Sequence, residues 1–218
     1  MNPSADSSFD YAAPASFLAG EEGSFTLPAF TFESAQTLPE MRVGYVTHGS
    51  LNAARDNAVL LLPGTANTRH SADGYIGPGK AFDSARDFVI AVDAIGAGTS
   101  SQPADGLGGD FPRYNIRDMV RVQQAFAERA FGLTRLKAVA GASMGAFQAL
   151  EWAIHFPDLV EAAVLLVPAA RAGQVFNAVV RIAGEVLMLD SHWTGQRYEE
   201  PPLAGLRAAG RLDRKSVV

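Results

Sequence analysis

The stretch Leu136-Lys137-Ala138-Val139-Ala140-Gly141-Ala142-Ser143-Met144-Gly145 decides the fold of this chain. Its first five residues form a short, mostly apolar run with a β-branched centre, which predicts a buried strand. The run continues directly into the pattern G-x-S-x-G, and residues 144–155 then have the composition of a helix. A strand, a tight turn and a helix in this order predict a nucleophile elbow, in which the serine on the turn exposes its hydroxyl group.

Ser143 is the candidate nucleophile of this turn. A serine on so sharp a turn needs neighbours without side chains, and Gly141 and Gly145 meet that need. The turn places Ser143 at the amino end of the following helix, where the helix dipole and free N–H groups stabilise an oxyanion. The alternative interpretation is a glycine-rich strand-to-helix turn without a chemical role.

The composition excludes several classes of protein. The chain has 218 residues, a length that suits one domain, or one domain with part of a second. It has no cysteine, so it contains no disulfide, no thiol nucleophile and no cysteine-based zinc site. Its net charge of −5 gives no general attraction to nucleic acid or to anionic membranes.

The sequence also lacks the patterns of export and membrane insertion. The first positively charged side chain is Arg42, and no apolar run of about 7–15 residues precedes it, as a secretory signal would require. No stretch approaches the roughly 20 apolar residues of a membrane span. We therefore expect a cytoplasmic protein that acts on a small molecule, with no metal, no cofactor, and no nucleic-acid or membrane partner.

Buried strands alternate with helices along most of the chain. Residues 24–33 and 41–47 have strand spacing and predict an opening antiparallel pair. Apolar runs predict buried strands at residues 57–62, 88–92, 136–140 and 162–167, and periodic segments predict helices at 115–131, 144–155 and 174–189. This alternation predicts an α/β fold, with a mostly parallel sheet and helices on both faces. We expect residues 1–22 to form a loosely ordered N-terminal arm and residues 23–189 to form the core.

A second part of the site is expected in the loop after the strand at residues 57–62. A protein with a nucleophile elbow takes an oxyanion donor from a loop in this place. The candidate donors are the backbone N–H groups of Thr65 or Ala66, together with that of Met144. The alternative interpretation of the loop is an ordinary turn at the end of a strand.

Two further motifs are weaker candidates. Residues 74–80 match G-x-x-x-x-G-K, the start of a phosphate-binding loop, but Ala81 replaces the hydroxyl residue that would hold magnesium, and no strand precedes the motif. The four histidines have no metal-ligand spacing. Asp190 and His192 follow Ser143 in the order nucleophile, acid, base, but they are two residues apart, whereas the acid and base of such a triad lie on separate loops.

Several local signatures occur along the chain in the order in which one known family has them. They are Val46-Thr47-His48-Gly49-Ser50-Leu51-Asn52, Ile76-Gly77-Pro78-Gly79-Lys80-Ala81-Phe82-Asp83, Ile116-Arg117-Asp118-Met119-Val120 with Gln123, the elbow with Gln148-Ala149-Leu150-Glu151-Trp152-Ala153, and Asp190, Trp193, Gly195 and Tyr198. Together they cover roughly residues 40 to 210 and resemble the homoserine O-acetyltransferase branch of the α/β-hydrolase superfamily. The segment Leu62-Pro63-Gly64-Thr65 departs from the H-A-L-T-G pattern that is common in this branch and is closer to plain hydrolases.

The resemblance implies an α/β-hydrolase fold and a two-step acyl transfer. Ser143 would attack an acyl thioester such as acetyl-CoA, which serves as cosubstrate, and a small alcohol such as homoserine would then take the acyl group. An esterase or thioesterase, in which water takes the acyl group, is an alternative. A second alternative is a non-catalytic truncated chain or pseudoenzyme.

The family places its catalytic acid and histidine beyond the lid. The resemblance therefore implies that this chain is C-terminally truncated, that its late strands and most of its lid are missing, and that residues 190–218 begin the lid. The strand at residues 162–167 would then be an apolar edge of the sheet, which predicts association with other chains. A homodimer is one option that the resemblance implies for a full-length protein.

Overall fold

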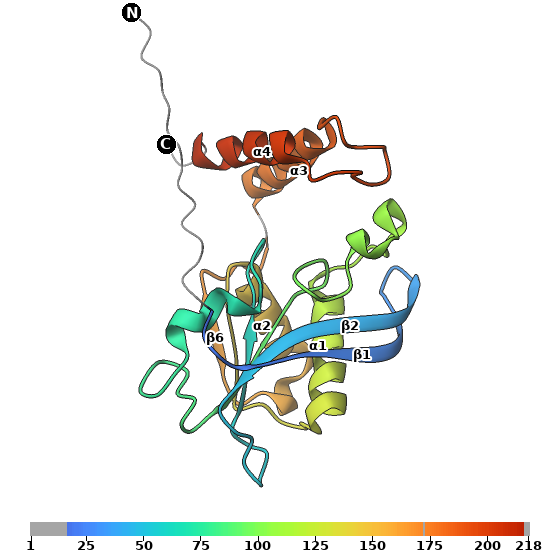
Figure 1. Ribbon diagram of the computed structural model, residues 1–218. Coiled ribbons are helices and arrows are strands. Elements are labelled where there is room, and N and C mark those ends of the chain that lie inside the picture. The colour runs from blue at the N-terminus through green and yellow to red at the C-terminus, as the bar shows by residue number, and fades with distance from the viewer. Residues whose placement is uncertain (1–16, 172, 216–218) are drawn as a thin grey trace, which may run out of the picture.

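A six-stranded sheet forms the centre of the computed structural model, which describes residues 17–171 and 173–215 (Figure 1). The strand order is β1-β2-β4-β3-β5-β6. Strands β1 (Glu21–Thr31) and β2 (Thr37–His48) form an antiparallel hairpin, and β2 pairs antiparallel with β4 (Phe88–Val92). Strands β3 (Ala58–Leu62), β5 (Ala138–Ala142) and β6 (Ala163–Leu166) continue the sheet parallel to β4. The predicted α/β architecture is confirmed.

The two faces of the sheet are covered differently. Helices α1 (Ile116–Phe131) and α2 (Met144–His155) pack on one face, where the buried side chains include Leu60, Ile90, Val120, Phe126 and Trp152. On the other face, Ile76 and the short 3-10 helix η1 (Arg69–Tyr75) lie over a smaller apolar cluster that includes Val59, Leu61, Val89 and Ala140. Strands β3 and β4 are buried along their whole length because alternate side chains pack on opposite faces.

Helix α1 begins and ends at local signals in the sequence. The Asn115 side chain accepts a hydrogen bond from the N–H of Asp118 at 3.0 Å, and the Asp118 carboxylate accepts one from the N–H of Asn115 at 3.3 Å. This reciprocal capping box satisfies two N–H groups that the first turn leaves free. The helix ends at Gly132, whose φ of 62° lies in the left-handed region that favours glycine.

The N-terminal boundary differs from the expected one. Strand β1 begins at Glu21, inside the segment that the composition predicts to be a loose arm, and pairs with β2 from its first residue. Ahead of it, the Phe17 ring stacks on His70 with centroids 4.1 Å apart, and the Leu18 N–H donates to Asp73. These contacts are long-range, so the local composition contains no sign of them. Residues 1–16 lie outside the described residues.

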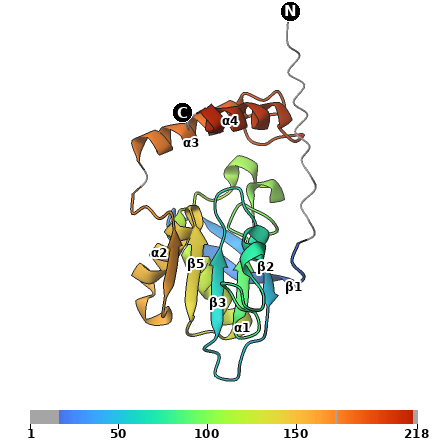
Figure 2. The same cartoon turned by 90° about the vertical axis from the view of Figure 1, so that its left-hand side faces the viewer.

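Helices α3 (Gln174–Met188) and α4 (Leu203–Lys215) pack against each other beyond the carboxyl ends of the parallel strands (Figures 1 and 2). Many of their apolar side chains are exposed, among them Val175, Phe176, Val180, Ile182, Leu203 and Leu206. The loop between them reaches the short helix η3 (Gly108–Asp110), where the N–H of Gly109 donates to the carbonyl of Gln196 at 2.8 Å. Two further 3-10 turns are η2 (Pro103–Asp105) and η4 (Pro157–Leu159).

Candidate active site

Ser143 lies on a strained turn between β5 and α2. Its φ of 54° and ψ of −120° are unusual for a residue with a side chain. The turn is fixed from both sides, since the Ser143 N–H donates to the Leu166 carbonyl at 3.0 Å and its carbonyl accepts from the N–H of Ala146 at 2.9 Å. The predicted strained elbow is therefore confirmed as a conformation. Strain of this kind is typical of functional sites.

A cavity of about 540 Å³ opens beside Ser143. Its walls are mainly apolar and include Leu61, Leu62, Pro63, Ala72, Tyr75, Phe82, Val92, Ala140, Val164 and Leu166. Neutral polar groups come from Thr65, Asn67, Thr68 and Ser71, and Arg69 is the one charged side chain among the described lining residues. The volume of the cavity falls within the range of roughly 300–1,000 Å³ that is typical of small-molecule sites.

The loop after β3 passes directly beside the candidate nucleophile. A Cβ built on Gly64 would lie 3.9 Å from the Cβ of Ser143. Thr65 lines the cavity, whereas Ala66, with a φ of 59°, and Met144 are not among the lining residues. Met144 is the first residue of α2, so its N–H is one of those that the helix leaves without an internal partner. The role of these three N–H groups as oxyanion donors stays a prediction.

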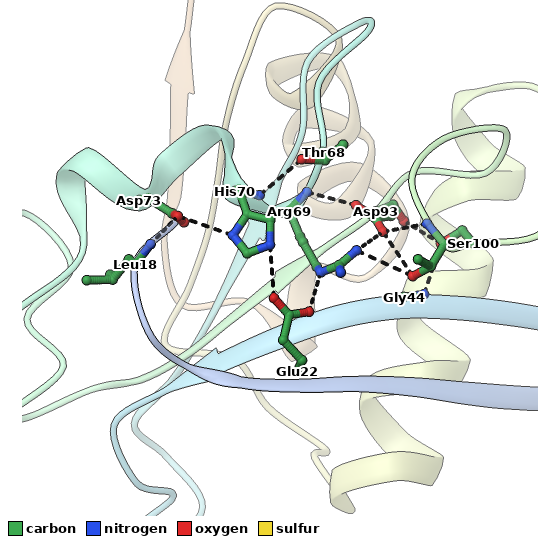
Figure 3. A network of polar contacts seen from close by, with 10 residues as sticks. Leu18, Glu22, Gly44, Thr68, Arg69, His70, Asp73, Asp93 and Ser100 are labelled. Carbon is green, nitrogen blue, oxygen red and sulfur yellow. Dashed lines mark hydrogen bonds and ion pairs between the residues drawn. The ribbon is translucent and has the colours of Figure 1, made fainter. Parts of the chain in front are cut away.

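An ion cluster holds the far end of this loop (Figure 3). The backbone N–H of Arg69 donates to Asp93 at 2.8 Å, and its guanidinium donates to the same carboxylate at 2.5 Å and to Glu22 at 2.6 Å. The Asp93 side chain is fully buried and also accepts from the Thr99 N–H at 2.9 Å. Burial acts to lower the pKa of Arg69, but the hydrogen bonds and charges of Glu22 and Asp93 outweigh it and raise the pKa, so the guanidinium stays charged.

The same cluster joins the loop to the N-terminal strand. Glu22, at the start of β1, lies 2.9 Å from Nε2 of His70, and Nδ1 of His70 lies 3.1 Å from Asp73 (Figure 3). His70 and Asp73 belong to η1, which forms one wall of the cavity. Because β1, β4 and η1 are all tied to one group of charges, the cavity wall is fixed by residues far apart in the sequence.

The structure brings Asp190 and His192 together but not to Ser143. His192 Nδ1 lies 2.9 Å from the Asp190 carboxylate, which also accepts from the backbone N–H of His192 and from that of Gly205. The hydrogen bond from Gly205, followed by that from His192, lowers the pKa of Asp190. These contacts tie the end of α3 to the start of α4. Neither residue is among those that line the Ser143 cavity.

The remaining sequence patterns concern His155, the motif at residues 74–80, metal binding and membrane insertion. His155 pairs with Glu151 on α2 at 2.7 Å. Residues 74–80 begin in the last two residues of the 3-10 helix η1 and not after a strand, which is unlike a phosphate-binding loop. Within the ranges that the structure describes, no three His, Asp or Glu side chains form a group that could hold a metal ion. None of the described helices is both long and apolar enough to span a membrane.

Sequence reasoning missed the charged residues around the loop. Glu22, Arg69 and Asp93 come from three distant segments, so no local motif contains them. One signal was present, because Asp93 directly follows the buried strand β4, and the carboxyl ends of parallel strands line the functional edge of such sheets. A charged residue in that position is a candidate member of a site.

Comparison with known proteins agrees with this fold. Residues 57–203 match the family model described as alpha/beta hydrolase fold. The homoserine O-acetyltransferase of Chloroherpeton thalassium is 38% identical in an alignment that covers 82% of this chain and 50% of that protein. The homoserine O-succinyltransferase of Magnetococcus marinus is 41% identical in an alignment that covers 76% of this chain and 47% of that protein.

Solved structures show the same fold. The crystal structure of an acetylester hydrolase from Corynebacterium glutamicum superposes with a TM-score of 0.84 at 29% identity, covering 88% of this chain and 57% of that one. The chain spans about half the length of the curated relatives it matches. The chain belongs to the alpha/beta hydrolase fold family, and the homoserine O-acetyl- and O-succinyltransferases are among its relatives there.

Proposed function

We propose that this chain carries the nucleophile of a serine acyltransferase, which moves an acyl group from acyl-CoA to a small alcohol of the homoserine type. The observation that carries the proposal is the placement of Ser143, on a strained turn that lines a mainly apolar cavity and lies beside the loop after β3. The relatives named homoserine O-acetyltransferase and O-succinyltransferase support the choice of reaction.

The reaction would proceed in two steps. The Ser143 Oγ attacks the thioester carbonyl while a base takes its proton, and the tetrahedral intermediate places its negative oxygen toward the backbone N–H groups of Thr65 or Ala66 and Met144. The C–S bond then breaks, the base gives its proton to the leaving CoA thiolate, and an acyl-serine is left. In the second step the hydroxyl of the acceptor gives its proton to the base and attacks the acyl carbon. The bond from that carbon to Ser143 Oγ then breaks, and the base returns the proton to Ser143.

The general base is the part of the site that the described residues lining the Ser143 cavity do not supply. None of the histidines that the structure describes lines the Ser143 cavity. We therefore propose that the general base and its carboxylate partner come from sequence outside this segment, as the twofold length of the relatives would allow. Residues 190–218 would then begin a lid over the cavity, and a homodimer and a cytoplasmic location stay predictions.

Hydrolysis is the second candidate function. It is supported by the structural likeness to an acetylester hydrolase and by Pro63-Gly64-Thr65, where the sequence resembles plain hydrolases. In that case water replaces the alcohol in the second step, and the chemistry of Ser143 is unchanged.

Product analysis separates these functions. The protein encoded by the longest reading frame that contains this sequence is incubated with acetyl-CoA and homoserine, with Ser143→Ala as the control variant. We expect O-acetylhomoserine from the unsubstituted protein and none from the variant. Acetate without an acylated acceptor would favour the hydrolase, and the absence of any Ser143-dependent product would favour a non-catalytic protein.

A further inference from the structure

A chain of three buried side chains runs from the core to the candidate oxyanion hole. The indole N–H of Trp152 donates to Gln123 Oε1 at 2.9 Å, and Gln123 Nε2 donates to Gln148 Oε1 at 2.6 Å. Gln148 Nε2 then donates to the Pro63 carbonyl at 3.1 Å and to the Met144 carbonyl at 3.3 Å. All three side chains are almost fully buried, at 1%, 3% and 0% exposure.

The direction of this chain follows from its first member. An indole N–H can only donate, so the group of Gln123 that faces Trp152 must be its oxygen. The other end of the Gln123 amide is therefore a donor and must face the oxygen of Gln148. The NH₂ group of Gln148 therefore points at two carbonyls. Each side-chain nitrogen and oxygen of Trp152, Gln123 and Gln148 then has a hydrogen-bond partner.

The two carbonyls belong to the two halves of the candidate oxyanion hole. Pro63 begins the loop that carries Thr65 and Ala66, and Met144 carries the N–H next to the nucleophile. One NH₂ group bound to both carbonyls fixes the distance between the loop after β3 and the first turn of α2. A displacement of about 1 Å at such a site is enough to lower a rate by roughly a hundredfold.

We infer that Gln148 is a positioning residue for the oxyanion hole and that Trp152, acting through Gln123, sets the direction of its amide. The inference rests on the proposed function for its catalytic meaning, but its structural part does not depend on activity. Gln148 itself does not touch the reacting atoms. It acts through the backbone of Pro63 and Met144.

The test uses the 218-residue chain and three matched substitutions to methionine, which keep length and flexibility but remove the amide. Gln148→Met removes both bonds to the carbonyls, and Gln123→Met removes the group that fixes the Gln148 amide. Gln124→Met is the control, because Gln124 is the next residue on α1 and its amide bonds only to Glu128 on the exposed surface. Backbone hydrogen exchange is measured by mass spectrometry, and Ser143 labelling by a fluorophosphonate is measured in parallel.

We expect amide exchange in residues 64–69 and 144–147 to rise together, by about tenfold or more in Gln148→Met and by less in Gln123→Met, with β4 unchanged. Gln124→Met should match the unsubstituted chain. Unchanged exchange in the two segments, or a uniform rise that includes β4, would overturn the inference. Where exchange changes locally but the fluorophosphonate labels another serine in place of Ser143, the positioning result stands and the proposed function fails.

Discussion

At the scale of single residues, the elbow depends on two glycines that pack against backbone. A Cβ built on Gly141 would lie 2.4 Å from the carbonyl carbon of Gly145, and one built on Gly145 would lie 2.2 Å from the Leu62 carbonyl oxygen. Both distances are far inside van der Waals contact, and neither neighbour is a flexible side chain that could move away. The strained φ of Ser143 is therefore imposed by close packing of β5, α2 and the end of β3.

Gly145→Ala should destabilise the fold. The new methyl group would force the first turn of α2 away from Leu62, and overpacking of this kind costs about 1–3 kcal/mol. Gly184→Ala on α3 is the control, since nothing lies within 4 Å of a Cβ built on Gly184. This substitution should stabilise the helix by roughly 0.5–1 kcal/mol. Urea denaturation followed by circular dichroism measures both, and equal midpoints for the two variants would contradict the packing argument.

At the scale of elements, the joint between α3 and α4 depends on one carboxylate. Asp190 accepts hydrogen bonds from the N–H groups of Gly205 and His192, and these bonds lower its pKa from the ordinary value of 3.8. A carboxyl with a lowered folded pKa stabilises the structure above its unfolded pKa. That stabilisation is lost as the pH falls through the lower, folded value.

The joint should therefore loosen in acid below pH 3.8. We expect the Gly205 amide to exchange faster, relative to β4 at the same pH, as the pH falls through this window. In Asp190→Asn the neutral amide still accepts a hydrogen bond but does not titrate, so the ratio should stay constant with pH. A chain whose Gly205 exchange ratio is as flat as that of the variant would rule out Asp190 as the cause. Hydrogen exchange followed by mass spectrometry measures the ratio.

The elements themselves could be predicted because their signals are local. Continuous apolar runs placed β3, β4 and β6 to within about a residue or two, and the periodic segment at residues 115–131 placed α1 to within a residue. The strained turn at Ser143 followed from G-x-S-x-G in its strand-to-helix context. The ion cluster of Glu22, Arg69 and Asp93 could not be predicted, because its members meet only through strand pairing across the sheet.

The amide chain was hidden for a different reason. Gln123, Gln148 and Trp152 all stand in the quoted signatures, but a polar residue on an apolar helix face has no assigned partner until the two helices are packed. Their mutual satisfaction is a property of the α1–α2 interface. Only the structure gives its direction.

At the scale of the whole molecule, β6 is one edge of the sheet. Two of its apolar side chains, which also line the Ser143 cavity, are exposed, with Val164 at 42% and Leu166 at 56%, and no charge interrupts the strand. An apolar edge without charges is a template for pairing with another chain. The predicted edge position of residues 162–167 is confirmed. The exposed apolar side chains of α3 add further apolar surface that favours association with other chains.

Val164→Lys should reduce self-association of the 218-residue chain, because a charge on an edge strand opposes pairing. Ile154→Lys is the control, since Ile154 is 60% exposed but belongs to helix α2 and not to the edge strand itself. Light scattering at equal concentration should show a smaller mean mass for Val164→Lys alone. Equal effects of both substitutions would mean that general solubility, and not the edge, governs association.

The central claim is that Ser143 is the nucleophile and that its base lies outside the described residues of this chain. The most direct measurement is the rate and position of labelling by a fluorophosphonate, read by peptide mass spectrometry on the 218-residue chain and on Ser143→Ala. We predict slow labelling confined to Ser143, because loss of a triad member lowers the rate by about 10⁴-fold or more. Labelling at another serine would contradict the choice of nucleophile, and rapid labelling of Ser143 would contradict the missing base and direct attention to His192 and Asp190.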